Sequence, residues 1–374
     1  MRFTLSSTAL SSKLLALSRV INSKNSLPIL SDFVFEVSGN TLRLTASDSE
    51  NTMKTSMELA ESDEDGSFAI GNHNLLEAVK GFSEQPLTFE VDRQENLVRI
   101  IYQNGKFSLP IENADEFPQI QQVGEGATVM TIGSDLLAEN LNRTLFAAGQ
   151  SELRPVMNGI CFDLTPDCLA IVATDTQKLV RNRVFAVRSD VPATFILPKK
   201  PASLLKNMLS KDGGDVTIKF DDRNAEITFD DCVIICRLIE GRYPNYNAVI
   251  PQSNPNQMTV DRQAFLSALR RVQPFANTSS SLIRFHIENG VLQLDAEDYD
   301  FSKTATEKLN CEYSGQPMTI GFKGTSFIEL LSNIECQDVV IQMTDPSRAG
   351  VVVPAEQPEG QEVLMLLMPL LLNY

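Results

Sequence analysis

One motif occurs three times in the chain, at spacings that indicate tandem domains. An apolar run, an alanine and an aspartate two residues later recur at 42–48, 169–175 and 292–298. The alanines, Ala46, Ala173 and Ala296, lie 127 and 123 residues apart. Solenoid repeats reach about 50 residues at most, so this period predicts whole repeated domains rather than a solenoid.

Other landmarks recur with the same period. Pro118 and Pro244 lie 126 residues apart. The first helix of each repeat is predicted to bury three side chains at the same offsets from a threonine. These side chains are Leu10, Leu14 and Leu17, then Leu137, Leu141 and Thr144, then Phe265, Leu269 and Val272. Gly- and Asn-rich segments between the repeats give predicted domains of 1–124, 127–252 and 256–374.

Each repeat contains many short strand patterns and two helix patterns. This content predicts an α+β fold, with helices on one side of antiparallel sheets, in three tandem copies. If successive repeats contact one another in the same way, the chain forms an arc. A second copy joined head to tail would complete a ring.

Composition limits the function. Only two histidines are present, and no spacing suits a metal site, so no metal or cofactor is expected. The six scattered cysteines are predicted to be reduced. No apolar run is long enough to cross a membrane and no secretory signal is seen, so a cytoplasmic protein is expected. No phosphate-binding loop or catalytic triad stands out, and no enzymatic activity is predicted.

The basic residues are sorted along the sequence. The net charge of −16 argues against nucleic acid as a partner at first sight. However, residues 2–30, 199–211 and 262–284 hold basic residues and no acidic ones. Asp and Glu gather elsewhere, as at 61–65. The basic residues are therefore predicted to lie on particular helices, where they could attract a phosphate backbone without reading sequence.

The motifs resemble those of a known family. The triplication, the segments 27–30, 173–175 and 241–244, and Met368-Pro369 resemble the bacterial sliding clamps, the beta subunits of DNA polymerase III, over the whole chain. The resemblance implies a non-catalytic, head-to-tail homodimeric ring around duplex DNA, with two helices per domain facing inward and sheets outside. It implies that a clamp loader opens the ring, and that the polymerase III catalytic subunit and other proteins dock on it through short peptide motifs.

The resemblance and the charge pattern together give a set of predicted DNA-facing residues. They lie on the first and second helices of the repeats and in adjacent loops. The set is Arg19, Lys24, Lys80, Arg143, Gln150, Arg154, Lys199, Lys200, Lys206, Arg270 and Arg271.

The resemblance also implies a pocket for partner peptides between the second and third repeats. Its residues would be Met157, Thr174, Thr176, Gln177, Lys178, Leu179, Pro244, Val249, Leu366, Leu367, Met368 and Pro369. Leu179 and Leu367 also suit a plain core. The family usually has Gly-His-Arg where this chain has Thr176-Gln177-Lys178, which changes the expected rim. The apolar tail, 370–374, is expected to cover the pocket when no partner is bound.

For the dimer contact, the resemblance implies that Phe107 and Leu109 meet Pro274 and Phe275 of a second copy. Residues 106–109 alternate like an edge strand, which could pair across chains. The alternative is that these residues pack within their own domains.

Two further alternatives concern the function. Asp48, Asp175 and Asp298 could gather around a metal rather than shape turns. The chain could also be a β-rich scaffold that binds only proteins.

Overall fold

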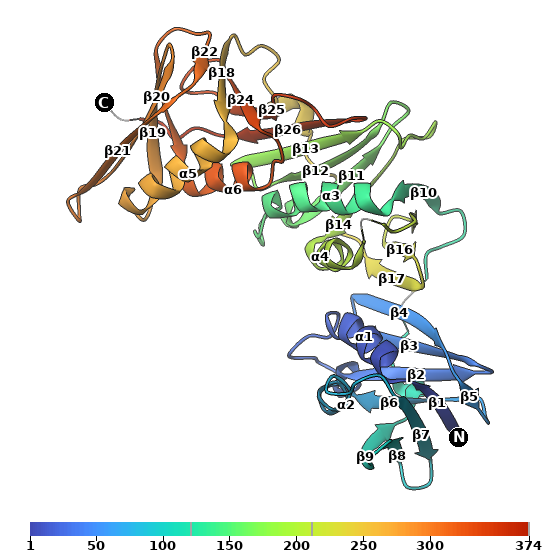
Figure 1. Ribbon diagram of the computed structural model, residues 1–374. Helices are drawn as coiled ribbons and strands as arrows, with labels where there is room; N and C mark the ends of the chain where they lie inside the picture. The colour runs from blue at the N-terminus through green and yellow to red at the C-terminus, as the bar shows by residue number, and fades with distance from the viewer. Residues whose placement is uncertain (120–121, 211, 373–374) are drawn as a thin grey trace. The chain divides into compact units, whose positions relative to one another are not determined.

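The computed structural model describes residues 1–119, 122–210 and 212–372 (Figure 1). Each repeat runs through one strand, a helix, four strands, a second helix and three strands. The first and third repeats add a two-residue strand, β5 or β22. The repeated order confirms the predicted α+β fold of three tandem copies.

The elements of the three repeats are as follows. The first has β1 (Arg2–Ser6), α1 (Ser7–Ser18), β2 (Asp32–Ser38), β3 (Thr41–Ser47), β4 (Asn51–Glu58), β5 (Glu61–Ser62), β6 (Gly66–Gly71), α2 (Asn72–Val79), β7 (Pro86–Asp92), β8 (Leu97–Tyr102) and β9 (Gly105–Glu112). The second has β10 (Thr128–Gly133), α3 (Ser134–Thr144), β11 (Gly159–Leu164), β12 (Leu169–Thr174), β13 (Lys178–Val184), β14 (Ala193–Pro198), α4 (Lys199–Met208), β15 (Asp215–Phe220), β16 (Asn224–Phe229) and β17 (Cys232–Arg237). The third has β18 (Asn256–Asp261), α5 (Arg262–Val272), β19 (Leu282–Glu288), β20 (Val291–Asp298), β21 (Lys303–Asn310), β22 (Glu312–Tyr313), β23 (Met318–Lys323), α6 (Gly324–Ser332), β24 (Asp338–Met343), β25 (Gly350–Pro354) and β26 (Gln361–Leu367).

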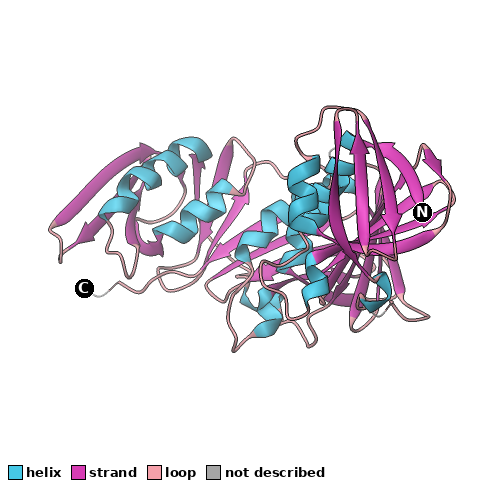
Figure 2. Ribbon diagram, turned by 90° about the horizontal axis from the view of Figure 1, so that it is seen from below, coloured by secondary structure: helices cyan, strands magenta, loops and turns pink. Residues whose placement is uncertain are grey.

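The helices α1 and α5 begin at side-chain caps, and the first helix of each repeat buries one face. The Ser6 hydroxyl accepts a hydrogen bond from the Ala9 amide at 3.2 Å, and the Asp261 carboxylate accepts one from Ala264 at 2.7 Å. These bonds satisfy amides that a helix leaves open at its start. All nine predicted core positions of α1, α3 and α5 are buried. The helix α1 packs against α2, and α5 packs against α6. Figure 2 shows helices lying against strands.

The chain divides into two compact units, 1–138 with 203–238, and 139–202 with 239–374. The first unit holds a 13-stranded antiparallel sheet in the order β10-β15-β16-β17-β4-β3-β2-β6-β9-β8-β7-β1-β5. The second holds a nine-stranded sheet, β14-β11-β12-β13-β26-β25-β24-β18-β22, and a four-stranded sheet, β21-β20-β19-β23. No helix in the described ranges is long and apolar enough to cross a membrane.

Strand pairing joins successive repeats at equivalent places. β4 of the first repeat pairs with β17 of the second, with Thr52 opposite Ile235. β13 of the second repeat pairs with β26 of the third, with Leu179 opposite Leu366. Thr52 and Leu179 lie one repeat apart in the sequence, so the two junctions use the same register.

Two strand edges at corresponding places carry no strand partner among the described residues. β21 is the outermost strand of its sheet and corresponds to β4 and β13. β9 corresponds to β17 and β26; its residues 111–112 pair with β6, whereas 105–110 pair with β8 alone. Residues 106–109 therefore pair with a strand on one side and leave the other side open, as predicted for an edge strand.

Candidate functional site

The turn between β12 and β13 is built by its own polar side chains. The Asp175 carboxylate accepts hydrogen bonds from the amides of Gln177 and Lys178, each at 2.9 Å. The Thr174 hydroxyl donates to the Lys178 carbonyl at 2.8 Å, and Thr176 adopts a left-handed φ of 80°. Asp48 likewise accepts hydrogen bonds from two amides of its own turn. Both aspartates therefore shape turns, and no group of three or more possible metal ligands lies within the described residues.

Lys178 is a buried cation at the start of β13. Its ammonium lies 2.7 Å from the Glu329 carboxylate of α6 and 3.3 Å from that of Asp175. Burial alone would lower the pKa of Lys178, but the hydrogen bond to Glu329 and the charges of Asp175 and Glu329 raise it above its usual value. Lys178 is thus fixed to α6 rather than extended into solvent, and sequence reasoning did not identify Glu329 as its partner.

An apolar cluster lies next to this turn. Leu179 and Leu366, opposite one another in the β13·β26 pair, are buried with Tyr243, Tyr246 and Ile250. The Tyr246 hydroxyl donates to Asp163 at 2.7 Å, and burial, with this hydrogen bond, raises the pKa of Tyr246. The cluster therefore brings together side chains from several separate segments of the second and third repeats.

The predicted pocket residues divide into buried and exposed groups. Thr174, Lys178, Leu179, Leu366 and Leu367 are buried. Met157, Pro244 and Pro369 are half-buried, and Thr176 and Gln177 are exposed. Val249 is 55% exposed and Met368 37%. Leu179 and Leu367 therefore belong to the core in this structure, as the simpler interpretation held, and the exposed apolar surface comes from Val249 and Met368.

The apolar tail follows a defined path as far as residue 372. The Met368 amide donates to the Gln177 carbonyl at 2.8 Å, which holds the tail beside the β12–β13 turn. Two residues later the Leu370 amide donates to the Gly321 carbonyl at 2.8 Å, in an antiparallel bridge to β23. Residues 373 and 374 lie outside the described residues. Leu370 is therefore attached to the edge of the third repeat, and the predicted covering of the pocket by 370–374 stays a prediction.

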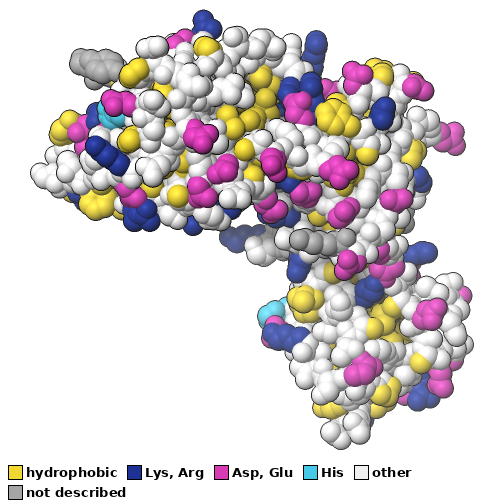
Figure 3. Space-filling model, turned by 45° about the horizontal axis from the view of Figure 1, so that its top comes forward, with side chains coloured by type: hydrophobic (Ala, Val, Ile, Leu, Met, Phe, Trp, Pro, Cys, Tyr) yellow, Lys and Arg dark blue, Asp and Glu magenta, His cyan; other side chains and the backbone are white. Residues whose placement is uncertain are grey.

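Most of the predicted DNA-facing residues are accessible. Arg19, Lys24, Lys80, Gln150, Arg154, Arg270 and Arg271 are exposed, and Lys199, Lys200 and Lys206 are half-buried on α4. Lys80 pairs with Glu77, and Arg271 pairs with Glu307. Burial, with the nearby charge of Lys178, lowers the pKa of Lys199. Acidic side chains are spread over the face seen in Figure 3, as the net charge requires.

Arg143 corrects the sequence-based set. Arg143 is only 3% exposed. Its guanidinium pairs with the Glu139 carboxylate and donates a hydrogen bond to the Gln361 side chain at 3.1 Å. A buried and paired guanidinium cannot attract a phosphate backbone in this conformation. The helical offset placed Arg143 off the apolar stripe of α3, but it could not reveal that β26 supplies a polar partner there.

The predicted dimer residues are partly accessible. Pro274 is exposed and Phe275 is 40% exposed. Phe107 and Leu109 are half-buried on β9. Phe107 also lies 6.2 Å from Tyr102 and 6.4 Å from Phe82 between ring centroids, so it packs within its own domain in the single chain. None of the six cysteines forms a disulfide in this structure.

Comparisons with known proteins agree along the whole chain. Models of the N-terminal, central and C-terminal domains of the DNA polymerase III beta subunit match residues 1–121, 131–245 and 247–369. The beta sliding clamp of Pseudomonas aeruginosa is 26% identical over 367 residues, which cover 98% of this chain and 99% of that protein. The beta sliding clamp of Escherichia coli is 24% identical over 373 residues, which cover 99% and 100%.

Solved structures agree with these sequence matches. A crystal structure of a sliding clamp, DNA polymerase III subunit beta, from Pseudomonas aeruginosa matches with a TM-score of 0.94 at 25% identity and covers 100% of both chains. A DNA polymerase III beta subunit from Thermotoga maritima, at 23% identity and a TM-score of 0.90, supports the fold. With three domain models matching in order and the same fold throughout, the chain belongs to the sliding clamp family, the beta subunits of DNA polymerase III, and acts as a processivity factor for that polymerase.

Proposed function

We propose that the chain works as a head-to-tail homodimeric ring that encircles duplex DNA without reading its sequence. The ring itself has no catalytic activity and needs no cofactor. It docks the DNA polymerase III catalytic subunit, the clamp loader and other proteins that carry clamp-binding peptides. The family supports these partners and a cytoplasmic location. The predicted domains, 1–124, 127–252 and 256–374, remain part of this proposal.

The unpaired edges of β9 and β21 carry the proposal of a ring. Across the repeats, Ala305 corresponds to Met53 and Val180, because each lies opposite the repeated alanine. Phe107 corresponds to Ile234 and Met365, because they lie opposite the equivalent residues Ile100, Ile227 and Val352. Met53 lies opposite Ile234, and Val180 lies opposite Met365. Pairing Phe107 with Ala305 of a second copy would therefore form the same junction a third time.

Head-to-tail pairing of this kind can close into a ring of two copies. Each copy offers one β9 edge and one β21 edge, so two copies leave no such edge open. Phe275 and Pro274 lie in the segment after α5, which contacts β21, so they could add apolar contact beside the paired edges. The accessible basic residues on α4, α5 and the neighbouring loops support DNA binding.

The proposed pocket for partner peptides lies at the β13·β26 junction. The buried cluster of Leu179 and Leu366 gives it a rigid apolar floor, and Val249 and Met368 provide accessible apolar surface. Methionine repacks readily, which suits a site that binds several different peptides. Thr176 and Gln177 supply the polar rim.

Retention on DNA tests the proposal. The chain would be loaded on a nicked circular duplex by a bacterial clamp loader with ATP, and the DNA would be separated by gel filtration. A ring is expected to stay on the circle and to leave when a restriction enzyme linearises it. Retention on the linear form, or no retention on the circle, would contradict the ring. Peptide binding without retention would favour the protein-binding scaffold.

A further inference from the structure

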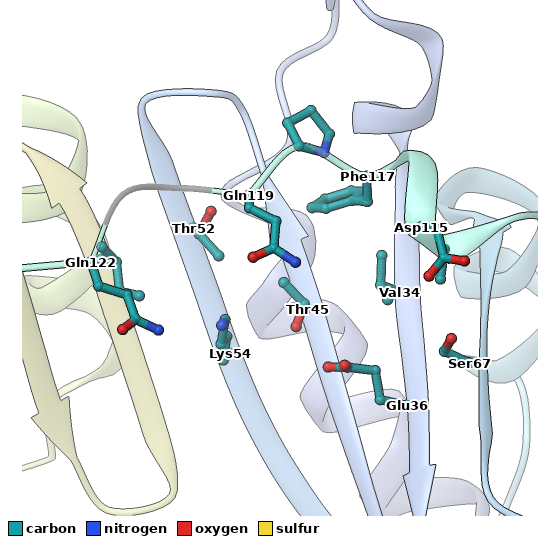
Figure 4. Close-up of a pocket in the computed structure, with 13 residues that line it drawn as sticks. Val34, Glu36, Thr45, Thr52, Lys54, Ser67, Asp115, Phe117, Gln119 and Gln122 are labelled. Atoms are coloured by element: carbon teal, nitrogen blue, oxygen red, sulfur yellow. The ribbon is translucent and has the colours of Figure 1, made fainter.

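A cavity of about 180 Å³ lies at the junction between the first and second repeats. Its floor is formed by β2, β3, β4, β6 and β17, and its other wall is formed by side chains from 114–119 and by Gln122. Glu36, Thr45 and Lys54 lie on neighbouring strands beneath Phe117 and Gln119 (Figure 4). The full lining is Val34, Glu36, Thr45, Thr52, Lys54, Ser67, Ala114, Asp115, Phe117, Pro118, Gln119, Gln122 and Ile235.

This cavity is the counterpart of the proposed peptide pocket, one repeat earlier. Thr52 faces Ile235 across β4 and β17, as Leu179 faces Leu366 across β13 and β26. Pro118, which lines the cavity, corresponds to Pro244 of the proposed pocket. The two sites are thus built from equivalent strands and equivalent closing segments.

The floors of the two sites differ in polarity. The cross-strand row Val34, Thr45, Lys54 corresponds to Cys161, Val172, Arg181. Val172 is fully buried in the apolar cluster. The Thr45 residue is only 6% exposed, and its hydroxyl has no hydrogen-bond partner within the described residues. A buried polar group without a partner is unfavourable, so its presence on a cavity wall points to a ligand that supplies one.

The charged groups of the cavity also lack partners. Arg181 pairs with Glu362 and donates to Asn247 at 3.0 Å. Its counterpart Lys54 makes no ion pair or side-chain hydrogen bond within the described ranges, and neither does Glu36. Both donors and acceptors are thus available around an apolar surface formed by Val34, Phe117 and Ile235.

We propose that this cavity anchors an extended peptide of a partner protein through one uncharged hydrogen-bonding side chain, such as glutamine. An amide side chain could accept from Lys54 and donate to Glu36, while its methylene groups contact Phe117. The volume suits a single anchor residue, because whole drug-sized ligands need about 300 Å³ or more. The inference rests on the proposed function, since it extends peptide docking from the second junction to the first.

The test uses the full chain with ¹³C-labelled valine, leucine and isoleucine methyl groups. N-acetyl-glutamine-methylamide is titrated to about 10 mM, followed by methyl chemical shifts. The signals of Val34 and Ile235 are expected to move. N-acetyl-leucine-methylamide is expected to move the signals of Val249 and Leu366 instead, which tests the proposed pocket separately.

Three variants sharpen the result. Thr45→Val introduces the residue type found at position 172, and Lys54→Met removes the cation. Each is expected to weaken glutamine binding about tenfold or more. Thr41→Val, on the same strand but outside the cavity, is the matched control and should bind as the parent does. Thermal melts verify that each variant folds.

Two results would overturn the inference. One is the absence of any shift at Val34 and Ile235, which would mean that the cavity holds solvent only. The other is equal binding by the parent and both cavity variants. Failure of the leucine probe at Leu366, with glutamine still bound, would count against the proposed peptide pocket and leave this cavity standing.

Discussion

At the scale of single residues, the position that follows the repeated aspartate has a strained backbone conformation in two of the repeats. Ser49 and Thr176 lie one repeat apart and adopt φ values of 81° and 80°. This region is favourable for glycine and unfavourable for a β-branched side chain. The family commonly has glycine here, so the chain keeps the turn geometry at the expense of strain.

Thr176→Gly is expected to stabilise the turn. Removing the side chain relieves steric strain of about 1–3 kcal/mol, which the greater freedom of glycine in the unfolded chain offsets by up to about 1 kcal/mol. We expect a net gain of about 1 kcal/mol, measured as slower amide exchange in the peptides that cover β12 and β13. Thr174→Gly, in the strand itself, is the control and should accelerate exchange.

Asp32 makes stability depend on pH. It is 8% exposed at the start of β2, and burial, with the nearby charge of Glu112, raises its pKa to about 6. The folded chain therefore holds this proton more tightly than the unfolded chain, whose aspartates titrate near pH 3.9. Its contribution is most favourable below about pH 4 and is lost as pH rises to about 6.

Asp32→Asn is expected to remove the loss of stability that ionisation of Asp32 causes as pH rises. Relative to the parent, the variant should gain stability between about pH 4 and pH 6, by up to roughly 3 kcal/mol, and should keep the gain at neutral pH. Urea denaturation at several pH values measures it. Asp222→Asn, at an exposed position, serves as the control. A constant difference between Asp32→Asn and the parent at all pH values would contradict the assignment.

At the scale of elements, the cap of α5 is held by one carboxylate. Asp261 is exposed, and its carboxylate accepts from the Ala264 amide. Asp261→Ala should destabilise α5 by about 1 kcal/mol, whereas Asp261→Asn should cost only a few tenths. Hydrogen exchange of the α5 peptides is the direct measurement, because it reports local opening. Equal exchange in the two variants would show that the cap contributes nothing.

Local pattern predicted the elements well and their partners poorly. The apolar run 169–172 lies within β12, the alternating 180–184 lies within β13, and the helix offsets identified buried positions of α1, α3 and α5. Such patterns arise from periods within one segment. The pairings of β4 with β17 and of β13 with β26 join distant segments, and no local period encodes them.

At the candidate site, too, the segments were predicted better than the partners of their side chains. Resemblance identified the segments that meet around Leu179 and Leu366, and the structure places both side chains in one buried cluster. It did not identify the partners of Lys178 and Arg143, because Glu329 and Gln361 come from the third repeat. The polar cavity beneath Phe117 was also missed. Comparing the polar Thr45 with the apolar Val172 at the equivalent position would have indicated it.

At the scale of the whole molecule, the proposed dimer makes a clear prediction. Phe107→Asp and, separately, Phe275→Asp should convert a species of twice the 41.4 kDa chain mass into a monomer. Light scattering across a dilution series measures this. Phe185→Asp alters an exposed aromatic residue outside β9, β21 and the segment after α5, and this variant should remain dimeric. Because Phe107 also contacts Tyr102, a circular dichroism melt must accompany its variant.

The oligomeric state of Phe275→Asp is more informative than that of Phe107→Asp, because Phe275 is the more accessible side chain. A parent chain that is strictly monomeric at micromolar concentration would rule out a stable ring. In that case topological tethering would no longer be a function of the unaided chain. Dimers in all three variants would move the interface away from β9 and the segment after α5.

The pairing of β4 with β17 also has a consequence for how the protein is made. Synthesis delivers β4 long before β17, and β13 long before β26, so each strand waits with one unpaired edge. Unpaired edges of newly made chains are sites of aggregation. Lys54 on β4, and Arg181 and Arg183 on β13, place charges on the waiting strands, a common protection against aggregation. The strands that join the repeats in the finished molecule therefore carry an open edge while the chain is being translated.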